Sequence, residues 1–552
     1  MGSETRQKKY LQIDSKDNVL VALQDLPRGE NIVFGETRFQ LTDEVRGKHK
    51  FFIRDMSPGE EVIMYGVLVG KMEMAVPRGG LMTTKNISHA AEPYDYRISG
   101  FHWSAPDNTR FKNRSFRGYR RTGGRTGTAN YWLFIPTVFC ENRNLDVIRE
   151  ALQHELGYAR TDKYRKFTHQ LLEAYREGKD PGNLSSGGST GEGYPERPFK
   201  HIDGIKFLNH SGGCGGTRQD AETLGRLLAA HADHPNVGGI TLLSLGCQNL
   251  QVADFLKYLK ERNPDFDKPL YIFEQQQSKS EEDLVREAIQ KTFLGLVELN
   301  KTGRTETPLS ELCIGVKCGG SDGFSGISAN PAVGYAADLL VSLGGKILLA
   351  EFPELCGVEQ ELIDRCSTEE TARKFIRLMG AYEALAKQAG SGFHMNPSPG
   401  NIRDGLITDA IKSAGAAKKG GSSPIVDVLD YTEPVSKPGL SLVCTPGNDV
   451  EATTGKAAAG ATLILFTTGL GTPTGNPICP TIKLSTNSAL AGRMADIIDI
   501  DCGPIISGEK TIEEMGESIL EYCIKTASGE LAPRAVELNQ DDFIPWKRGV
   551  SL

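Results

Sequence analysis

Apolar and polar residues follow two different patterns along the chain. Between Leu11 and about Met82, short runs alternate apolar and polar residues, and turn signals such as Ser57-Pro58-Gly59 separate them. This pattern predicts a small all-β module over residues 1–90. From Gly118 onward, apolar runs of strand length alternate with helical patterns, which is typical of parallel sheets with helices on both faces.

The predicted fold class is therefore α/β, with a small N-terminal β module followed by two α/β domains with mainly parallel sheets. Residues 91–117 show no periodicity, and we interpret them as a linker. The first α/β domain is expected at 118–305 and the second at 306–552. A chain of 552 residues is long enough to give each domain a buried core.

The stretch from Leu312 to Glu354 predicts one βαβ unit. An apolar run at Leu312–Val316 leads through a glycine-rich loop into a helical pattern from about Ala332, and a second apolar run covers Ile347–Ala350. In open α/β sheets, ligands bind beyond the carboxyl ends of the strands. The polar residues expected at these two strand ends are Cys318, Ser321, Asp322, Glu351 and Glu354.

Each of these residues also has a structural interpretation. Glu351 and Glu354 could complement the dipole of a helix N-terminus, or one of them could bind metal or act as a general base. Ser321 and Asp322 could simply cap a helix. The sequence leaves these alternatives open.

Four of the eleven cysteines follow predicted strands. They are Cys140, Cys214, Cys247 and Cys318. A single buried cysteine is usually a small core residue, but four at equivalent strand ends indicate a site. Thiols together with His210 and carboxylates suit iron or zinc. The spacing contains no Cys-x-x-Cys pair, so the prediction depends on the strands lying side by side.

Composition narrows the class of partner. The formal net charge of −7 argues against nucleic acid, which would need a basic face. The first nine residues are polar, and no apolar run is long enough to cross a membrane, so we expect a cytoplasmic protein with reduced thiols. The oligomeric state stays open, with a homo-oligomer as one alternative.

Several long motifs resemble the altronate/galactarate dehydratase family. They are CGGSDGFSGISANPAVGYAADLL, NPSPGN, FTTGLGTP, PTVFC, NHSGGCG and LGCQ, together with a GKHK segment in a SAF-type N-terminal module. TPGNDVEATTG and FIPWKRGVSL are most similar to the altronate branch. The resemblance covers nearly the whole chain. It implies a hydro-lyase that converts D-altronate into 2-keto-3-deoxy-D-gluconate and water, with a requirement for Fe²⁺.

The resemblance also suggests roles. Iron, either mononuclear or in an iron–sulfur cluster, would be held among the four cysteines, with another divalent metal as an alternative. Proton transfer would fall to His49 or His210, with Glu351 or Glu354 as the partner. A lone histidine such as His49 is nevertheless more often structural. The substrate-binding residues would be Ser321, Asp322, Asn396, Asn401 and Lys483.

Three positions depart from the family pattern. Thr83 lies where a His-x-His-Asn segment is usual, Ile402 replaces a lysine, and Leu470 replaces an arginine. An arginine that grips a carboxylate cannot be replaced by leucine without loss of that contact. Galactarate, another sugar acid or a sulfolactate-type substrate is therefore an alternative to altronate. A non-catalytic sugar-acid-binding protein is a further alternative.

Overall fold

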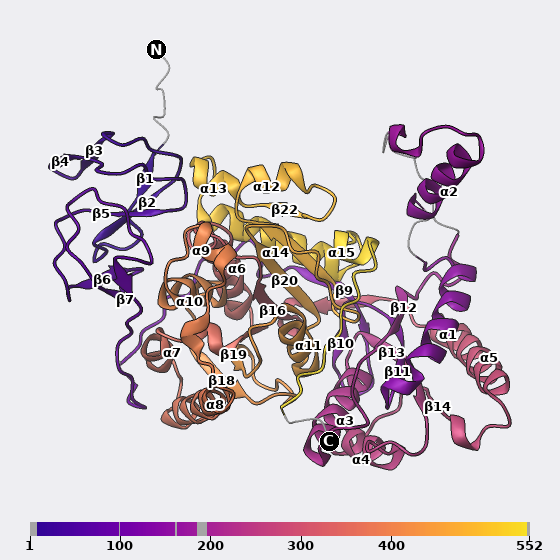
Figure 1. Cartoon of the computed structure of the whole chain (residues 1–552). Coiled ribbons are helices and arrows are strands. Elements are labelled where there is room, and N and C mark those ends of the chain that lie inside the picture. The colour runs from indigo at the N-terminus through magenta and orange to yellow at the C-terminus, as the bar shows by residue number, and fades with distance from the viewer. Residues whose placement is uncertain (1–7, 99, 160–162, 185–195, 549–552) are drawn as a thin grey trace.

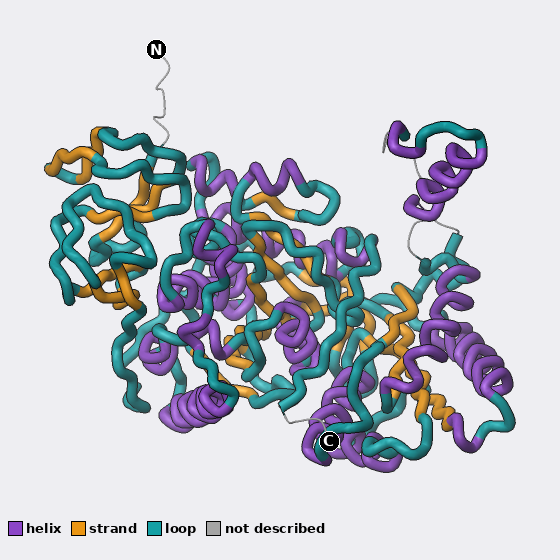
Figure 2. Tube along the Cα trace, viewed as in Figure 1, coloured by secondary structure: helices purple, strands orange, loops and turns teal. Residues whose placement is uncertain are grey.

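The computed structural model describes residues 8–98, 100–159, 163–184 and 196–548. Figure 1 shows the N-terminal module at one end of the molecule, the C-terminal α/β domain in the middle and the other α/β domain at the opposite end. In Figure 2 the N-terminal module consists of strands and loops, and the described helices belong to the two α/β domains. The predicted fold class is confirmed.

The N-terminal module is built from three small antiparallel sheets, in the strand orders β1-β2-β5, β3-β4 and β6-β7-β8. Their strands are β1 (Tyr10–Leu11), β2 (Val19–Ala22), β3 (Asn31–Phe34), β4 (Thr37–Gln40), β5 (Lys50–Phe52), β6 (Glu61–Met64), β7 (Val67–Met72) and β8 (Ile87–Ser88).

The second domain contains a four-stranded parallel sheet in the order β12-β11-β13-β14. Two apolar cores cover its faces, one formed with α3 and α4 and the other with α1 and α5. The elements are β11 (Tyr131–Pro136), α1 (Asn142–Glu155), α2 (Lys163–Arg176), β12 (Gly204–Phe207), α3 (Arg218–Asp233), β13 (Val237–Ser244), α4 (Val252–Arg262), β14 (Leu270–Glu274) and α5 (Glu281–Leu299).

The C-terminal domain contains a seven-stranded parallel sheet in the order β18-β19-β17-β16-β20-β21-β22. The strands are β16 (Cys313–Cys318), β17 (Lys346–Ala350), β18 (Ile425–Leu429), β19 (Gly439–Val443), β20 (Leu463–Thr468), β21 (Thr481–Ser485) and β22 (Ile500–Asp501). The helices are α6 (Ala329–Ser342), α7 (Glu359–Asp364), α8 (Glu369–Gln388), α9 (Pro399–Arg403), α10 (Asp409–Ala417), α11 (Asp449–Ala459), α12 (Ser488–Arg493), α13 (Gly503–Ser507), α14 (Ile512–Ala527) and α15 (Arg534–Glu537). None of the described helices is long and apolar enough to cross a membrane.

The predicted βαβ unit is present at the centre of this sheet. β16 and β17 are neighbouring parallel strands joined through α6, and Gly344 ends the helical segment at a φ of 86°. The strand residues are almost all buried because helices cover both faces, which explains their continuous apolar runs. The carboxyl ends of β16 and β17 consequently lie side by side.

The predicted linker, residues 91–117, ends in a strand. Its last residues begin β9 (Ser115–Arg120), which pairs with β10 (Thr126–Gly127) on one side and with β15 (Thr305–Pro308) on the other. This antiparallel sheet joins the local pair β9 and β10 to β15, which lies nearly 190 residues further along the chain. It lies where the two α/β domains meet (Figure 1).

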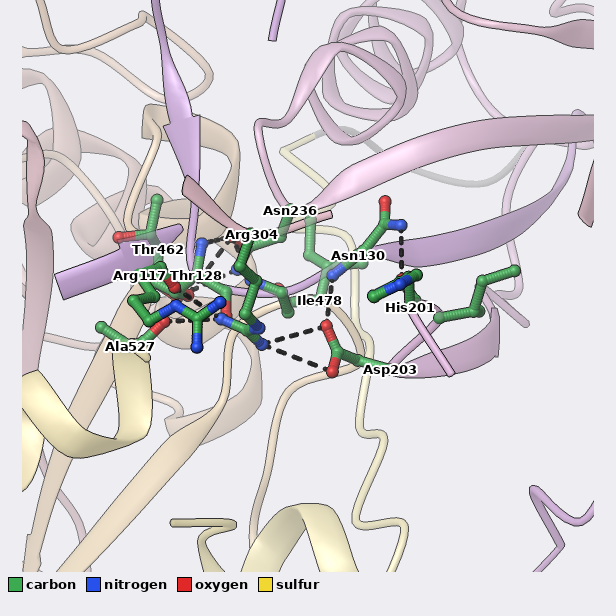
Figure 3. Close-up of polar contacts among 12 residues, drawn as sticks. Arg117, Thr128, Asn130, His201, Asp203, Asn236, Arg304, Thr462, Ile478 and Ala527 are labelled. Atoms are coloured by element: carbon green, nitrogen blue, oxygen red, sulfur yellow. Dashed lines mark hydrogen bonds and ion pairs between the residues drawn. The ribbon is translucent and has the colours of Figure 1, made fainter. Parts of the chain in front are cut away.

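A polar seam fastens the two α/β domains together (Figure 3). Asn236 of the second domain donates to the carbonyls of Thr462 (2.9 Å) and Ile478 (2.7 Å) of the C-terminal domain, and all three groups are buried. Arg304 pairs with Asp203 at 3.2 Å. Arg304 also donates to the carbonyls of Arg117, Thr128 and Ala527. These bonds satisfy buried polar groups and so fix one domain against the other.

Candidate active site

Neighbouring strand ends of the C-terminal sheet bring together three predicted site residues. Cys318 is the last residue of β16, Glu351 follows β17, and Glu354 lies in the short 3₁₀ helix that comes next. All three are buried, and one potential ligand atom from each lies within 4.8 Å of the others. The predicted convergence of these residues is therefore seen in the structure.

Buried lysines surround Glu351. Lys317 forms a short ion pair with Oε1, and Lys419 and Lys456 lie 3.1 Å and 3.7 Å from Oε2. All four side chains are fully buried. Burial alone would raise the pKa of Glu351, but the three ammonium groups outweigh it and hold that pKa well below its ordinary value. Glu351 is therefore a fixed negative charge.

The lysines differ in how well their charges are compensated. Glu351 and Asp449, which lies 2.9 Å from Lys317, hold the pKa of Lys317 well above its usual value despite burial. For Lys456 burial prevails, and its pKa falls to about 8. Glu351 itself adopts a φ of 75°, a left-handed conformation that is uncommon for a residue with a side chain. The ion pairs hold this strained turn in place.

Glu354 belongs to a second, more accessible pair. Its Oε1 accepts from Lys412 Nζ at 2.8 Å, and its Oε2 lies 3.9 Å from the Cys318 thiol. Lys412 also donates to the Asn396 side chain at 2.9 Å. These groups border an open pocket of about 400 Å³, a size that accommodates a small metabolite. The pocket is lined by Cys318, Gly319, Gly320, Ser321, Glu354, Asn396, Ser398, Asn401, Lys412, Gly447, Asn448 and Asp449.

Three of the predicted substrate-binding residues line this pocket, namely Ser321, Asn396 and Asn401. Asn401 donates to the Ser321 carbonyl at 2.7 Å, so the helix α9 is tied to the glycine-rich loop. Lys483 is not among the lining residues. It is buried on β21 and donates to Gln540 of the C-terminal segment. The expected contact between Lys483 and a substrate is therefore not supported by its position.

Asp322 turns away from the pocket toward the N-terminal module. Its carboxylate is fully buried, lies 2.9 Å from Lys48 Nζ and accepts a hydrogen bond from Thr486 at 3.1 Å. The Lys48 carbonyl lies so close to Gly323 and Gly405 that a Cβ at either glycine would approach it to 2.4 Å. Asp322 thus docks the N-terminal module on the glycine-rich loop, and a direct substrate contact is not what its geometry favours.

His49 lies in this docking turn of the N-terminal module. Its Nδ1 is 3.3 Å from the Gly47 carbonyl, and burial lowers its pKa. The next residue, Lys50, is completely buried and donates to the Gly405 carbonyl at 2.6 Å. The turn places His49 beside the second glycine contact, because the His49 backbone nitrogen lies 3.4 Å from a Cβ built at Gly405.

The other three predicted cysteines lie together on the second domain. Cys140, Cys214 and Cys247 follow β11, β12 and β13, which are adjacent strands, and all three are exposed. Burial, and then the neighbouring Cys214 and Cys247 thiols, raise the pKa of Cys140. Phe139 donates to the Gly212 carbonyl and Asn249 to the Gly213 carbonyl, both at 3.0 Å, so the three loops are bonded to one another. We call these residues the cysteine triad.

Cys318 is separate from the triad. Its thiol is buried among Lys419, at 3.2 Å, and the glutamates of the C-terminal domain. The predicted four-cysteine set is thus divided into three exposed thiols and one buried thiol. The carboxylates near Cys318 are already neutralised by lysines, which fits poorly with a divalent cation there. The triad, by contrast, offers three exposed thiols, which fits iron.

His210 supports a triad loop. Its Nε2 donates to the Pro136 carbonyl at 2.8 Å, and its Nδ1 accepts from the Gly212 backbone at 3.1 Å. Burial lowers the pKa of this histidine to about 4, so the ring is neutral near pH 7. With both ring nitrogens engaged, the geometry favours a positioning role over the proton transfer expected for His210.

The two sites border the same helix end. Asp449, the first residue of α11, lines the pocket, and the next residue, Val450, lines a second hollow together with Asn209 and Arg149 of the second domain. Asn209 follows β12, the strand that precedes Cys214. The polar ends of both parallel sheets therefore adjoin the first turn of α11.

The buried lysines that pair with Glu351 and Glu354 were not identified from the sequence. Lys317 interrupts an apolar strand, and Lys412, Lys419 and Lys456 lie in segments rich in alanine and glycine with few other charges. A lysine in such a setting is a signal, because a segment without an exposed polar face must bury it and a buried ammonium group needs a partner.

Together these features place a carboxylate next to an ammonium group at the pocket, an arrangement that is able to support acid–base chemistry. Family models match three successive parts of the chain. They describe the altronate/galactarate dehydratase SAF domain at residues 8–90, the second domain of D-galactarate dehydratase/altronate hydrolase at 118–300, and the C-terminal domain of D-galactarate/altronate dehydratase at 309–551.

Full-length relatives agree with these matches. The altronate dehydratase of Bacillus subtilis is 32% identical over 99% of this chain and 100% of its own length. The altronate dehydratase of Escherichia coli is 32% identical over 95% of this chain and 96% of its own. The galactarate dehydratase (L-threo-forming) of Escherichia coli is 29% identical over 96% and 94%. The chain belongs to the altronate/galactarate dehydratase family and is an altronate dehydratase-like lyase.

Proposed function

We propose that this protein dehydrates a sugar acid, converting D-altronate into 2-keto-3-deoxy-D-gluconate and water. The observation that carries this proposal is the Glu354–Lys412 pair, which lines an open pocket at the carboxyl ends of β16 and β17. The names of two full-length relatives support altronate as the substrate. We expect the reaction to take place in the cytoplasm.

The reaction begins with removal of a weakly acidic proton. The Glu354 carboxylate takes the proton from C2, next to the substrate carboxylate, and the Lys412 ammonium group stabilises the negative charge that develops there. The electron pair forms the C2–C3 double bond as the C3–O bond breaks. The resulting enol then rearranges to the 2-keto acid.

The departing 3-hydroxyl must take a proton to leave as water. Two groups that line the pocket can donate one. The first is the Lys412 ammonium group, and the second is the Cys318 thiol, which burial keeps protonated by raising its pKa. Glu351 and its lysines do not line the pocket. Their proposed role is to hold Cys318 and the turn before Glu354 in place.

We further propose that the cysteine triad holds iron. The three thiols are not among the described groups whose ligand atoms lie within 4.8 Å of one another. This spacing favours an iron–sulfur cluster, whose ligands surround several metal atoms, over a single ion. Iron with an open coordination position is a Lewis acid that polarises a hydroxyl or carboxylate oxygen.

Galactarate is the second candidate substrate. Leu470 lies beside the pocket, since its backbone nitrogen donates to the Gly320 carbonyl at 3.1 Å and its Cβ is 3.5 Å from a Cβ built at Gly320. At this position the chain offers no guanidinium group to a substrate carboxylate. A relative that dehydrates galactarate also aligns with nearly the whole chain.

An anaerobic assay tests the proposal. Protein loaded with iron is supplied separately with altronate, galactarate and other hexonates or hexarates, and the 2-keto-3-deoxy product is measured. Turnover of altronate above that of the other acids supports the proposal. Turnover of galactarate alone would replace the substrate, and absence of product from every acid would refute the dehydratase assignment.

A further inference from the structure

A second group of potential metal ligands lies behind the Glu354–Lys412 pair. It consists of His89, Cys356 and Asp409, and one ligand atom from each lies within 4.8 Å of the others. His89 follows β8, at the end of the N-terminal module. Cys356 directly follows the 3₁₀ helix that carries Glu354, and Asp409 is the first residue of α10, which also carries Lys412.

Asp409 is the residue whose surroundings indicate a bound cation. Its side chain is 1% exposed, and within the part of the chain that the structure describes its carboxylate interacts with the Cys356 thiol but accepts no hydrogen bond from a nitrogen or oxygen donor. Burial raises its pKa to about 8. An isolated buried carboxylate is costly unless it is paired with a cation. Lys412, whose charge lowers the pKa of Asp409, already donates to Glu354 and Asn396.

The surroundings of this group add negative charge. Glu359 is 6% exposed, and its Oε2 accepts from the Gly357 backbone at 2.6 Å. Burial raises the pKa of Cys356, and Glu359 and Asp409 raise it further. Three acidic groups and an imidazole thus face one another, whereas Glu351 in the neighbouring site is surrounded by three lysines.

The donor set identifies the class of cation. An imidazole, a thiolate and a carboxylate together suit zinc and similar borderline metals, whereas magnesium and calcium take oxygen ligands. Structural zinc sites are usually tetrahedral. Glu359 is the adjacent group that can supply a fourth ligand.

We propose that His89, Cys356 and Asp409, with Glu359, bind a zinc-type divalent cation that is distinct from the iron of the cysteine triad. The cation fastens the segment leaving the N-terminal module to the two elements that carry Glu354 and Lys412. This site does not depend on the substrate or on the dehydration chemistry.

Cobalt provides a direct probe, because Co²⁺ bound by a thiolate absorbs in the near ultraviolet and visible range. The experiment uses reduced, metal-free, full-length protein with the exposed thiols removed by C140S/C214S/C247S, so that the triad does not contribute. We expect one equivalent of Co²⁺ to produce the thiolate absorption and Zn²⁺ to abolish it by displacement.

Two further substitutions in that background locate the site. Cys356→Ser should remove the absorption, and His89→Ala should weaken Co²⁺ binding by at least about tenfold. Cys366→Ser is the matched control, because the buried Cys366 thiol instead donates to the Leu362 carbonyl at 3.5 Å. It should leave the absorption unchanged. Absence of the absorption in the triple variant, or its persistence after Cys356→Ser, would overturn the proposal.

Thermal unfolding measures metal binding independently of the cobalt absorption. Asp409→Asn removes a buried charge without changing the shape of the side chain, so the metal-free variant should unfold at the same temperature as the parent or a higher one. Zn²⁺ should raise the unfolding temperature of the parent and not that of the variant. An equal rise in both proteins would contradict the assignment.

Discussion

The pocket beside Glu354 and the exposed cysteine triad lie at equivalent places in their domains, since each is formed where adjacent strands of a parallel sheet end. They differ in burial and charge. At the pocket and in the Glu351 cluster next to it, buried carboxylates are matched by ammonium groups, which fixes the protonation state of Glu351. In the triad, the three thiols are exposed.

The difference shows that fold position alone does not decide what a site does. In both domains, the ends of adjacent parallel strands bring polar side chains close together. The charges around each site then decide its chemistry. Proton transfer needs a carboxylate beside a cation, whereas metal binding needs donor atoms that no ammonium group already neutralises.

The largest effect on turnover is expected from substitution of Glu354, the carboxylate that lines the pocket. Replacing Glu354 with glutamine should lower kcat by about 1,000-fold, because loss of a general base typically costs two to four orders of magnitude. Iron content should not change. Glu433→Gln, which removes the exposed partner of Lys374, is the control and should retain full activity. A Glu354→Gln enzyme with more than a tenth of the normal kcat would exclude Glu354 as the base.

Glu351 should matter most for stability. Glu351→Gln leaves three buried lysines without their shared anion, and we expect the free energy of unfolding to fall by about 3–5 kcal/mol. Denaturant titration measures this change. The same Glu433→Gln substitution serves as the control and should change stability by less than about 1 kcal/mol.

The pH dependence of that stability has a defined sign. The pKa of Glu351 is lower in the folded protein than in the unfolded chain, so its contribution is complete above the ordinary pKa of about 4.5. It decreases as the pH falls below that value. The difference in stability between wild type and Glu351→Gln should therefore shrink in acid, and a difference that grew in acid would contradict the ion pairs described.

Substitutions in the triad should lower the iron content, whereas substitutions at the pocket should leave it unchanged. Serine at Cys140, Cys214 or Cys247 should weaken iron binding by at least about tenfold, because a metal ligand is lost. Serine at Cys318 should leave the iron content unchanged, since that thiol contacts Lys419 and Glu354. Iron quantification after anaerobic reconstitution makes this measurement. Equal iron loss in all four variants would restore the four-cysteine set.

The smallest effect is expected where the N-terminal module docks. Lys48→Met removes the ion pair with the buried Asp322, and this should destabilise the folded protein by about 1–3 kcal/mol. Differential scanning calorimetry detects it as a lower unfolding temperature. Lys9→Met is the control, because its ion pair with Glu30 is on the surface. Equal shifts in the two variants would show that Lys48 is not a docking residue.

Much of the C-terminal domain could be predicted from local pattern. The two apolar runs and the Gly344-Gly345 stop define the βαβ unit, and strand-end logic then places Cys318 beside Glu351. The pairing of β9 with β10 is local, but its pairing with β15, nearly 190 residues away, leaves no periodic signal near either strand.

The contacts of individual side chains are harder to predict from the sequence. Asp322, His210 and Lys483 all follow or lie on strands near the polar edges, yet each bonds to protein groups instead of facing the pocket. The position of a residue in the sequence predicts that it lies at the end of a strand, but not the rotamer of its side chain or the group to which it bonds. The buried lysines appear in the sequence as charges within apolar segments, but the carboxylates that match them lie elsewhere in the chain.

The most direct test of the central claim follows the C2 proton of altronate by NMR in D₂O, with anaerobic, iron-loaded protein. We predict that the wild-type protein removes this proton and forms 2-keto-3-deoxy-D-gluconate carrying solvent deuterium at C3, and that Glu354→Gln leaves altronate intact. Altronate that stays unchanged with the wild-type protein, or is converted equally fast by Glu354→Gln, would contradict the account.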